Sequence, residues 1–371
     1  MKKLLIASAV SAALAAPTLA LAQAARGPTL SQVLDASGIN VSGYIDAGYS
    51  YANRNIEATP LFRVFDGQNN SFALHQFGLT VAKQPTRGFG GVVNITVGSD
   101  AQVIHSFPET TTAVGSMFDI TQAYGQYASG SLTLMAGKFV TLAGTEVIAS
   151  TGNMNISRSM LFGAVPFTHT GVRAGYAVSD IVTLYGGMNN GFDQLTDANK
   201  SKTLELGASI IPSRQLTINA TGYFGKESAT PPGAPGGAAE DQRQLLNVVA
   251  TYTINNRMSA GGEFLSVSQD RPVGGAAKYN GLAGYFTYNL NREWRVAGRL
   301  ENFDDKQGFH FATAGTKYNE LTGTLAYLPS SSIELRGEVR LDRANNPVFV
   351  NSNGTTAKSL QTLGLQGIYK F

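Results

Sequence analysis

The stretch that decides the fold is the carboxyl-terminal run Gln361-Thr362-Leu363-Gly364-Leu365-Gln366-Gly367-Ile368-Tyr369-Lys370-Phe371. Its odd positions are apolar, small or aromatic from Leu363 onward, and successive side chains of a strand point to opposite faces. The run therefore predicts a strand with one apolar face. A soluble protein has little reason to end an exposed strand on Phe. The last strand of a bacterial outer-membrane β-barrel, by contrast, lies against lipid. The terminal Phe371 resembles the sorting signal that the barrel-assembly machinery reads in such proteins.

The other end of the chain predicts export. Lys2 and Lys3 precede an apolar run over 4–16, and Ala20-Leu21-Ala22 supplies small residues for signal peptidase. We expect residues 1–22 to be a cleaved signal peptide, and the chain to be integral to the bacterial outer membrane. An uncleaved membrane anchor is the alternative, but the apolar run is too short to span a bilayer. No Cys follows the run, which excludes a lipoprotein anchor.

The composition fits a membrane barrel. The chain has 42 Gly, 15 Tyr, 19 Phe and no Cys, and only 14% of its residues are charged. No stretch after the signal peptide reaches the length of an apolar transmembrane helix, whereas a barrel strand needs only about 9–11 residues. The net charge of +3 falls to +1 (3 − 2) without the two Lys residues of the signal peptide. This balance argues against nucleic acid as a partner.

The middle of the chain predicts one all-β domain. Residues 23–38 form a periplasmic segment with a short helix over 28–38, where Thr29 can cap the start and Gly38 the end. From residue 39 to residue 371 the hydrophobic period is two. Sixteen strands are predicted, at 39–51, 71–83, 90–99, 118–128, 131–139, 168–178, 181–188, 203–211, 215–225, 244–254, 258–267, 279–289, 294–303, 317–328, 332–343 and 359–371.

The connections between these segments alternate between short turns and long loops. Ser129-Gly130 and Ser179-Asp180 are tight, whereas 52–70 and 140–167 are long. This alternation is typical of a transmembrane antiparallel up-and-down β-barrel with periplasmic turns, and a Greek-key sandwich would not keep it. Fourteen or eighteen strands are the alternatives, because the segments at 71–83 and 118–128 alternate poorly.

Charges recur on one face of several segments. In 332–343 the apolar residues alternate with charged ones, which are costly against lipid and tolerated in a wet lumen. The residues predicted to line the pore and to set its selectivity are Arg173, Arg295, Arg299, Glu301, Glu334, Arg336, Glu338 and Arg340. Arg and carboxylate side chains in a water-filled lumen select small charged or polar solutes. The equally weighted alternative is that they form ion-paired ladders that brace the wall.

The segment 137–176 carries a family resemblance. Its residues Gly137-Lys138-Phe139, Asn153-Met154-Asn155-Ile156-Ser157-Arg158-Ser159 and His169-Thr170-Gly171-Val172-Arg173 resemble the main block of the β-barrel porin-2 family of Gram-negative outer membranes. The resemblance extends over the mature chain. It implies a passive or weakly selective channel that lies in outer-membrane lipid and passes small hydrophilic solutes.

By analogy with the general porins, loop 140–167 is predicted to fold inward and narrow the channel. Glu146, Asn153, Asn155 and Arg158 are then the constriction candidates. An ordinary external cap is the alternative, although long loops without regular structure usually have a function.

Nothing in the sequence predicts catalysis. The chain lacks a Gly-x-Ser-x-Gly elbow and a His-Glu-x-x-His motif, and its four His residues have no metal-ligand spacing. A hydrolase would need Ser157 or Ser159 with His169, and no third group can be assigned to them. We therefore expect no enzyme activity, cofactor or metal. A structural or adhesive barrel is the main alternative to a channel and ranks above a hydrolase. Homo-oligomerisation is left open because no interface pattern is recognisable.

Overall fold

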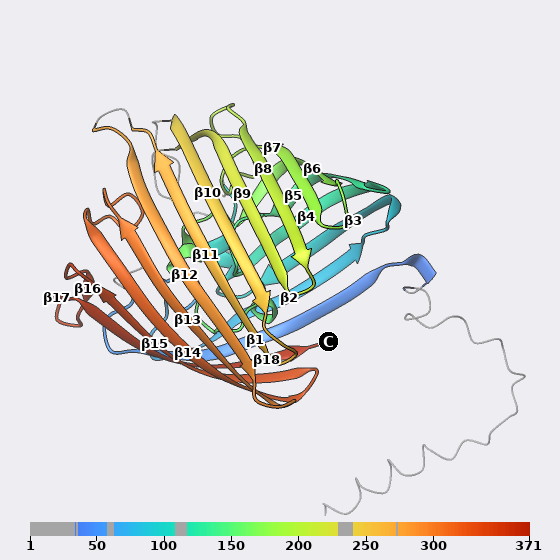
Figure 1. The fold of residues 1–371 in the computed structure, drawn as a ribbon. Coiled ribbons are helices and arrows are strands. Elements are labelled where there is room, and N and C mark those ends of the chain that lie inside the picture. The colour runs from blue at the N-terminus through green and yellow to red at the C-terminus, as the bar shows by residue number, and fades with distance from the viewer. Residues whose placement is uncertain (1–33, 35, 58–62, 108–116, 229–239, 272–273) are drawn as a thin grey trace, which may run out of the picture. The chain divides into compact units, whose positions relative to one another are not determined.

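Sixteen antiparallel strands close into a barrel within residues 40–371 (Figure 1). The computed structural model describes residues 34, 36–57, 63–107, 117–228, 240–271 and 274–371. The predicted signal peptide at 1–22 lies outside these residues, as does most of the predicted helix at 28–38. Leu34, Ala36 and Ser37 are helical, and Gly38 follows with a φ of 67°. The helix and the signal peptide stay predictions.

The predicted number of strands is confirmed, and the strand order follows the chain around the barrel. The sixteen strands are β1 Asn40–Ala52, β2 Ser71–Lys83, β3 Arg87–Val97, β4 Phe118–Ser129, β5 Leu132–Val140, β6 Thr168–Ala177, β7 Val182–Asn189, β8 Thr203–Ser213, β9 Leu216–Ser228, β10 Glu240–Thr253, β11 Met258–Gln269, β12 Ala277–Asn289, β13 Trp294–Asp305, β14 Thr316–Ser330, β15 Ile333–Ala344 and β18 Ser359–Lys370. Short elements lie in the connections: α2 Ala101–Ile104, η2 Ser150–Gly152, α3 Met160–Gly163, β16 Phe349–Val350 and β17 Thr356–Ala357. Among the described residues, no helix is long and apolar enough to cross a membrane.

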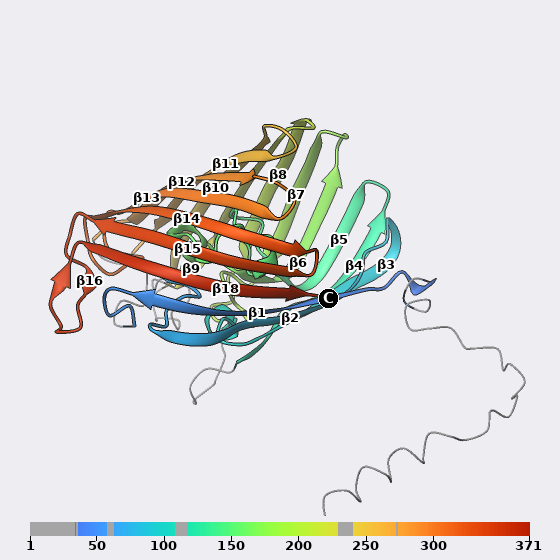
Figure 2. The ribbon, with the colours of Figure 1, turned by 90° about the horizontal axis from the view of Figure 1, so that it is seen from below.

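The carboxyl-terminal strand closes the barrel. It pairs with both β15 and β1, as Figure 2 shows. Beyond β18, the backbones of Phe371 and Gly43 exchange two N–H···O bonds of 2.9 Å. The predicted register also holds, because Leu365 is 63% exposed and Tyr369 50%, whereas Gln366 is 6% exposed. The apolar face of the terminal strand therefore points outward.

Two β-bulges explain the segments that alternate poorly. On β2, Asp46 pairs with Gln76 and Ala47 with Leu74, so His75 is an extra residue. On β4, Thr121 is the extra residue between the partners of Asn94 and Ile95. A bulge turns two successive side chains to one face and breaks the period of two. The sequence pattern fails at these strands because they carry bulges, and they are wall strands like the others.

Candidate functional site

The loop between β5 and β6, here called L3 (residues 141–167), spans the interior of the barrel. On one side, Gln76 of β2 donates to the Ile148 carbonyl at 2.9 Å and accepts the Ser150 N–H at 3.2 Å. On the other side, the Tyr223 hydroxyl of β9 accepts the Leu142 N–H at 3.0 Å. Seven strand-to-strand steps separate β2 from β9 by the shorter way around the barrel. L3 therefore bridges opposite walls.

Two charged residues of β13 hold L3 at its centre. Arg299 donates to Glu146 at 2.6 Å and to the Ser157 carbonyl at 2.8 Å, and it also pairs with Glu320 of β14 at 2.7 Å. Glu301 accepts the N–H groups that begin α3, those of Met160 at 2.9 Å and Leu161 at 2.7 Å. A carboxylate is stabilised by unpaired N–H groups at the start of a helical turn. Both side chains are buried.

The charged ladder of β15 also faces L3. Glu338 accepts the backbone N–H groups of Ile156 at 2.6 Å and Ser157 at 2.9 Å. Arg340 donates to the Arg158 carbonyl at 2.6 Å and pairs with Asp342. Arg336 reaches the Asn155 carbonyl at 3.3 Å and the Gln366 amide at 3.2 Å. Alternate residues of one strand thus bind three successive parts of the loop.

The remaining predicted wall residues lie away from the centre of L3. Arg173 pairs with Glu205 of β8, through a 2.7 Å bond from its Nη2, and reaches only the Val140 carbonyl at the end of β5. Its guanidinium lies 4.2 Å from the centre of the Phe139 ring. Arg295 pairs with Glu334 near the short-turn end of the barrel, where Lys370 also lies 3.5 Å from the carboxylate. These residues form local ion pairs on the wall.

The four predicted loop residues are buried inside L3. Glu146 accepts the Ser159 N–H at 2.6 Å, and Asn153 closes a turn with the N–H and carbonyl of Val147. Asn155 donates to Thr324 of β14 at 2.7 Å. Arg158 donates to three carbonyls of its own loop and lies over the rings of Phe65 and Phe162. Their polar atoms shape the loop and fasten it to the wall.

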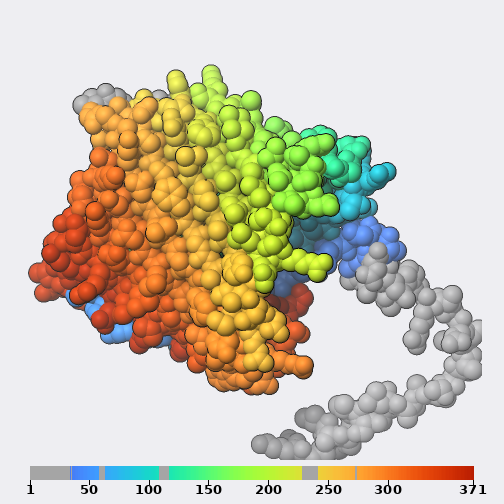
Figure 3. Space-filling view, in the orientation of Figure 1, coloured from blue at the N-terminus to red at the C-terminus, as the bar shows by residue number. Residues whose placement is uncertain are grey.

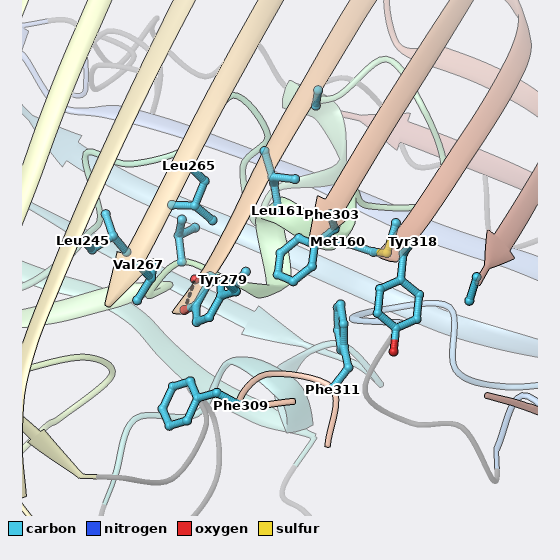
Figure 4. Packing of buried hydrophobic residues seen from close by; sticks show 14 of the residues in the cluster. Met160, Leu161, Leu245, Leu265, Val267, Tyr279, Phe303, Phe309, Phe311 and Tyr318 are labelled. Atoms are coloured by element: carbon cyan, nitrogen blue, oxygen red, sulfur yellow. Dashed lines mark hydrogen bonds between the residues drawn. The ribbon is translucent and has the colours of Figure 1, made fainter. Parts of the chain in front are cut away.

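An apolar cluster packs beside L3. Met160 and Leu161 of α3 pack with Phe303, which is fully buried, in a cluster that extends to Tyr279 and Tyr318 (Figure 4). A second cluster joins L3 to the first two long loops, since Phe162 and Phe167 of L3 pack with Phe65 and Ile104. Burial of these rings adds to the polar anchors in holding L3 in place.

Two cavities among the described residues lie on the faces of L3. The first, of about 210 Å³, lies against β1, β3 and β4 and is lined on the wall side by Tyr44, Asn94, Thr96, Thr121 and Gln122. The second, of about 200 Å³, lies against β10 to β13 and includes Thr251, Ser259, Tyr285 and Thr287. On the barrel-wall side both linings include uncharged polar side chains, and on the loop side Glu146 lines both cavities. We call the first space the β1–β4 cavity.

Several anchors were not predicted. Gln76 is brought inward by the β2 bulge, and the broken alternation around it was the only available signal. Asn247 of β10 accepts the Gly144 N–H at 2.9 Å, and Glu320 pairs with Arg299, but their strands alternate regularly and nothing in the sequence singles them out. Tyr223, which holds Leu142, was likewise missed.

The structure assigns other partners to the residues considered for hydrolysis. Ser159 caps α3 by accepting the Phe162 N–H at 3.0 Å, while Ser157 lies 3.1 Å from Arg299. His169 stacks on Tyr223 with ring centres 4.5 Å apart. Within the described part of the chain, no group of three His, Cys, Asp or Glu side chains could hold a metal ion.

Comparison with known proteins agrees with this geometry. The family described as "Putative beta-barrel porin-2, OmpL-like" matches residues 38–371. No curated protein sequence matches the chain. Three similar solved structures are outer-membrane proteins, each covering 90% of this chain. They are the channel DcaP of Acinetobacter baumannii (TM-score 0.60, 14% identity, 97% of that chain), OmpT of Vibrio cholerae in a trimer form (0.62, 12%, 99%) and the anion-selective porin of Comamonas acidovorans (0.61, 10%, 99%).

These likenesses support the fold, and the family match covers the whole barrel. Family and fold together indicate a channel rather than an enzyme. The chain belongs to the OmpL-like β-barrel porin-2 family and is a porin-like channel of the bacterial outer membrane.

Proposed function

We propose that the protein is a passive diffusion channel for small hydrophilic solutes, with L3 as its constriction. The observation that carries this proposal is the set of anchors that fasten L3 to opposite walls, from Gln76 on β2 to Tyr223 on β9. A loop held across the lumen leaves only the spaces on its two faces, and each described cavity there is about 200 Å³. Spaces of this size favour small solutes.

We also propose that the luminal Arg and Glu residues act on selectivity mainly by positioning L3. Seven of the eight predicted wall residues are at most 6% exposed, Arg295 being the exception. Their charges are neutralised at close range by each other and by the backbone of L3. On its barrel-wall side the β1–β4 cavity presents uncharged groups such as Asn94, Thr121 and Gln122, and the Glu146 carboxylate on its loop side is paired with Arg299. This arrangement favours neutral hydrophilic solutes and weak selectivity among ions.

The test is to place a charge in the β1–β4 cavity. Gln122→Glu keeps an acceptor for the Val140 N–H, which lies 3.4 Å from the Gln122 amide oxygen, and adds one negative charge. Reversal potentials measured in planar bilayers under a KCl gradient should show a severalfold increase in the permeability ratio of K⁺ to Cl⁻. Gln361→Glu, an exposed outward position on β18, is the matched control and should change nothing. A folded Gln122→Glu channel with unaltered selectivity would show that ions do not pass this wall.

For assembly, we propose that the barrel-assembly machinery reads Phe371. Its ring is 54% exposed and lies 6.3 Å from the Phe77 ring, centre to centre, while its backbone holds Gly43. Phe371→Ala keeps the backbone bonds and removes the ring, so it separates recognition from closure. The amount of barrel assembled in cells should fall while refolding in detergent continues. Normal assembly of Phe371→Ala would exclude the ring as the signal.

A further inference from the structure

On the outer face of β12 to β15, the side chains change from apolar to polar toward the end of the barrel that carries the long loops. The last apolar outward residue of each strand is a leucine, between 40% and 61% exposed, and the next outward residue is an asparagine or an arginine. By strand, the leucine and its successor are Leu282 and Asn280, Leu300 and Asn302, Leu321 and Asn319, and Leu341 and Arg343. The border between lipid and headgroup therefore lies between these two rows.

Four cations gather just at and above this border. Lys278, Lys306, Lys317 and Arg343 are all exposed, and we call them the basic rim. The Lys306 N–H donates to the Lys278 carbonyl at 3.2 Å, which places those two residues side by side. Asp304 is cross-strand from Lys317, with Oδ2 and Nζ 3.8 Å apart. The four cations and this one carboxylate give the rim a net charge of +3 (4 − 1).

The basic rim belongs to one side of the barrel. At the same end of β1, β2 and β4, the outward residues that the structure describes include Tyr51, Phe72 and Phe118, which are 45%, 85% and 48% exposed. Figure 3 views the outside of the yellow-to-orange strands, the side of the barrel formed by β10 to β15. Exposed cations also occur at this end near β8 and β9, at Lys202 and Lys226, so the basic rim is distinguished by four cations on neighbouring strands beside the leucine row.

Neighbouring cations repel one another unless an anion lies between them. Lys and Arg bind phosphate oxygens through charge-assisted hydrogen bonds, and their flexible stems reach along the membrane surface. The exposed amide groups of Asn302 and Asn319, which are linked at 2.9 Å, can hydrogen-bond sugar hydroxyls. Below them the leucine row offers apolar contact for acyl chains. Phosphate, sugar and several acyl chains occur together in the phosphorylated glycolipid of the outer leaflet.

We propose that the basic rim binds the phosphates of this outer-leaflet glycolipid, with its acyl chains against the leucines of β12 to β15. The site is independent of the channel, because Lys278, Lys317 and Arg343 lie on the outward face of their strands and Lys306 is exposed in the turn after β13. Its effect is to fix the depth and orientation of one side of the barrel in the outer leaflet.

The test titrates the purified, folded protein in detergent with bis-phosphorylated lipid A and follows bound lipid by native mass spectrometry. The triple variant Lys278→Gln, Lys317→Gln and Arg343→Gln should bind at least tenfold more weakly. The matched control neutralises three exposed cations of the short turns at the opposite end, Arg214→Gln, Arg257→Gln and Arg292→Gln. This control should bind like the unaltered protein. Equal losses in both variants, or no loss in the first, would overturn the proposal.

A second measurement needs no variant. Binding of bis-phosphorylated lipid A to the unaltered protein should weaken as NaCl is raised, because the interaction is between exposed charges. Dephosphorylated lipid A should bind at least tenfold more weakly, and millimolar inorganic phosphate should not displace the glycolipid. Phosphatidylglycerol bound as tightly as bis-phosphorylated lipid A would refute the glycolipid as the occupant. If binding depends neither on the NaCl concentration nor on the phosphate groups of lipid A, the proposed role of the cations is refuted.

Discussion

Arg299 is the residue whose removal should release L3 most directly. Its guanidinium is 1% exposed and joins Glu146 of L3, the Ser157 carbonyl of L3 and Glu320 of the wall. Arg299→Met keeps much of the volume and removes the charge. Glu146 and Glu320 then face each other without a buried cation between them. Removing one partner of a buried ion pair costs about 3–5 kcal/mol.

The loop can avoid this cost by leaving the wall, because it is flanked by strands that do not depend on it. A difference of about 3–5 kcal/mol changes the ratio of docked to released loop by a factor of roughly 10² to 4 × 10³. Glu301 and Glu338 still hold neighbouring parts of L3, so we expect partial release. Single-channel recordings should show a larger conductance with frequent transitions between levels, and liposome swelling should admit larger neutral solutes.

The matched control is Arg343→Met, the same substitution on an exposed, outward residue of β15. It removes one cation without touching L3, and its conductance should equal that of the unaltered channel. Heat-modified migration on gels checks that both variants form closed barrels. A folded Arg299→Met channel with unaltered conductance and solute cut-off would refute the view that the charged ladder positions a constriction.

Three further predictions concern the wall and the loops. Leu335→Arg places a charge on a lipid-facing residue, 48% exposed, and should cost about 2–4 kcal/mol in urea unfolding from lipid vesicles, whereas Leu335→Ile should be neutral. Burial, aided by the nearby Arg243, lowers the pKa of His310 to about 3, below its ordinary value of 6.5. The stability that this neutral ring contributes is present above pH 6.5 and is lost as the pH falls toward 3. The protection factors of the amides in loop 306–315, which are exchange rates corrected for the intrinsic effect of pH, should therefore fall on acidification, and His310→Phe should reduce this fall. Gly171→Ala would put a methyl group 2.2 Å from a backbone carbonyl of β7 and should prevent assembly, while Gly186→Ala, with nothing within 4 Å of the added carbon, should fold normally.

The wall was predictable because its signal is local. Successive residues such as Leu335 and Arg336 face lipid and interior by the geometry of any strand, and the burial of the two side chains confirms that register. The sequence did not predict that His75 and Thr121 are the extra residues of bulges. A strand with a bulge and a strand with an irregular apolar pattern look the same in the sequence. Their positions were nevertheless marked by the failure of the pattern.

The inward fold of the loop was predicted by analogy, but its individual pairings with the wall were not predictable, because the partners are distant in sequence. Glu146 meets Arg299 across 153 residues, and the Ile156 N–H meets Glu338 across 182. A period-two row of charges is compatible with a water-lined wall and with a wall that binds a loop, since either environment can satisfy the charges. The two cases differ in exposure, which a periodicity does not encode. Here the deciding feature is a loop that carries its own carboxylate, amides and free N–H groups to the wall. The same charges that predicted a wet lumen are therefore the reason that L3 occupies it.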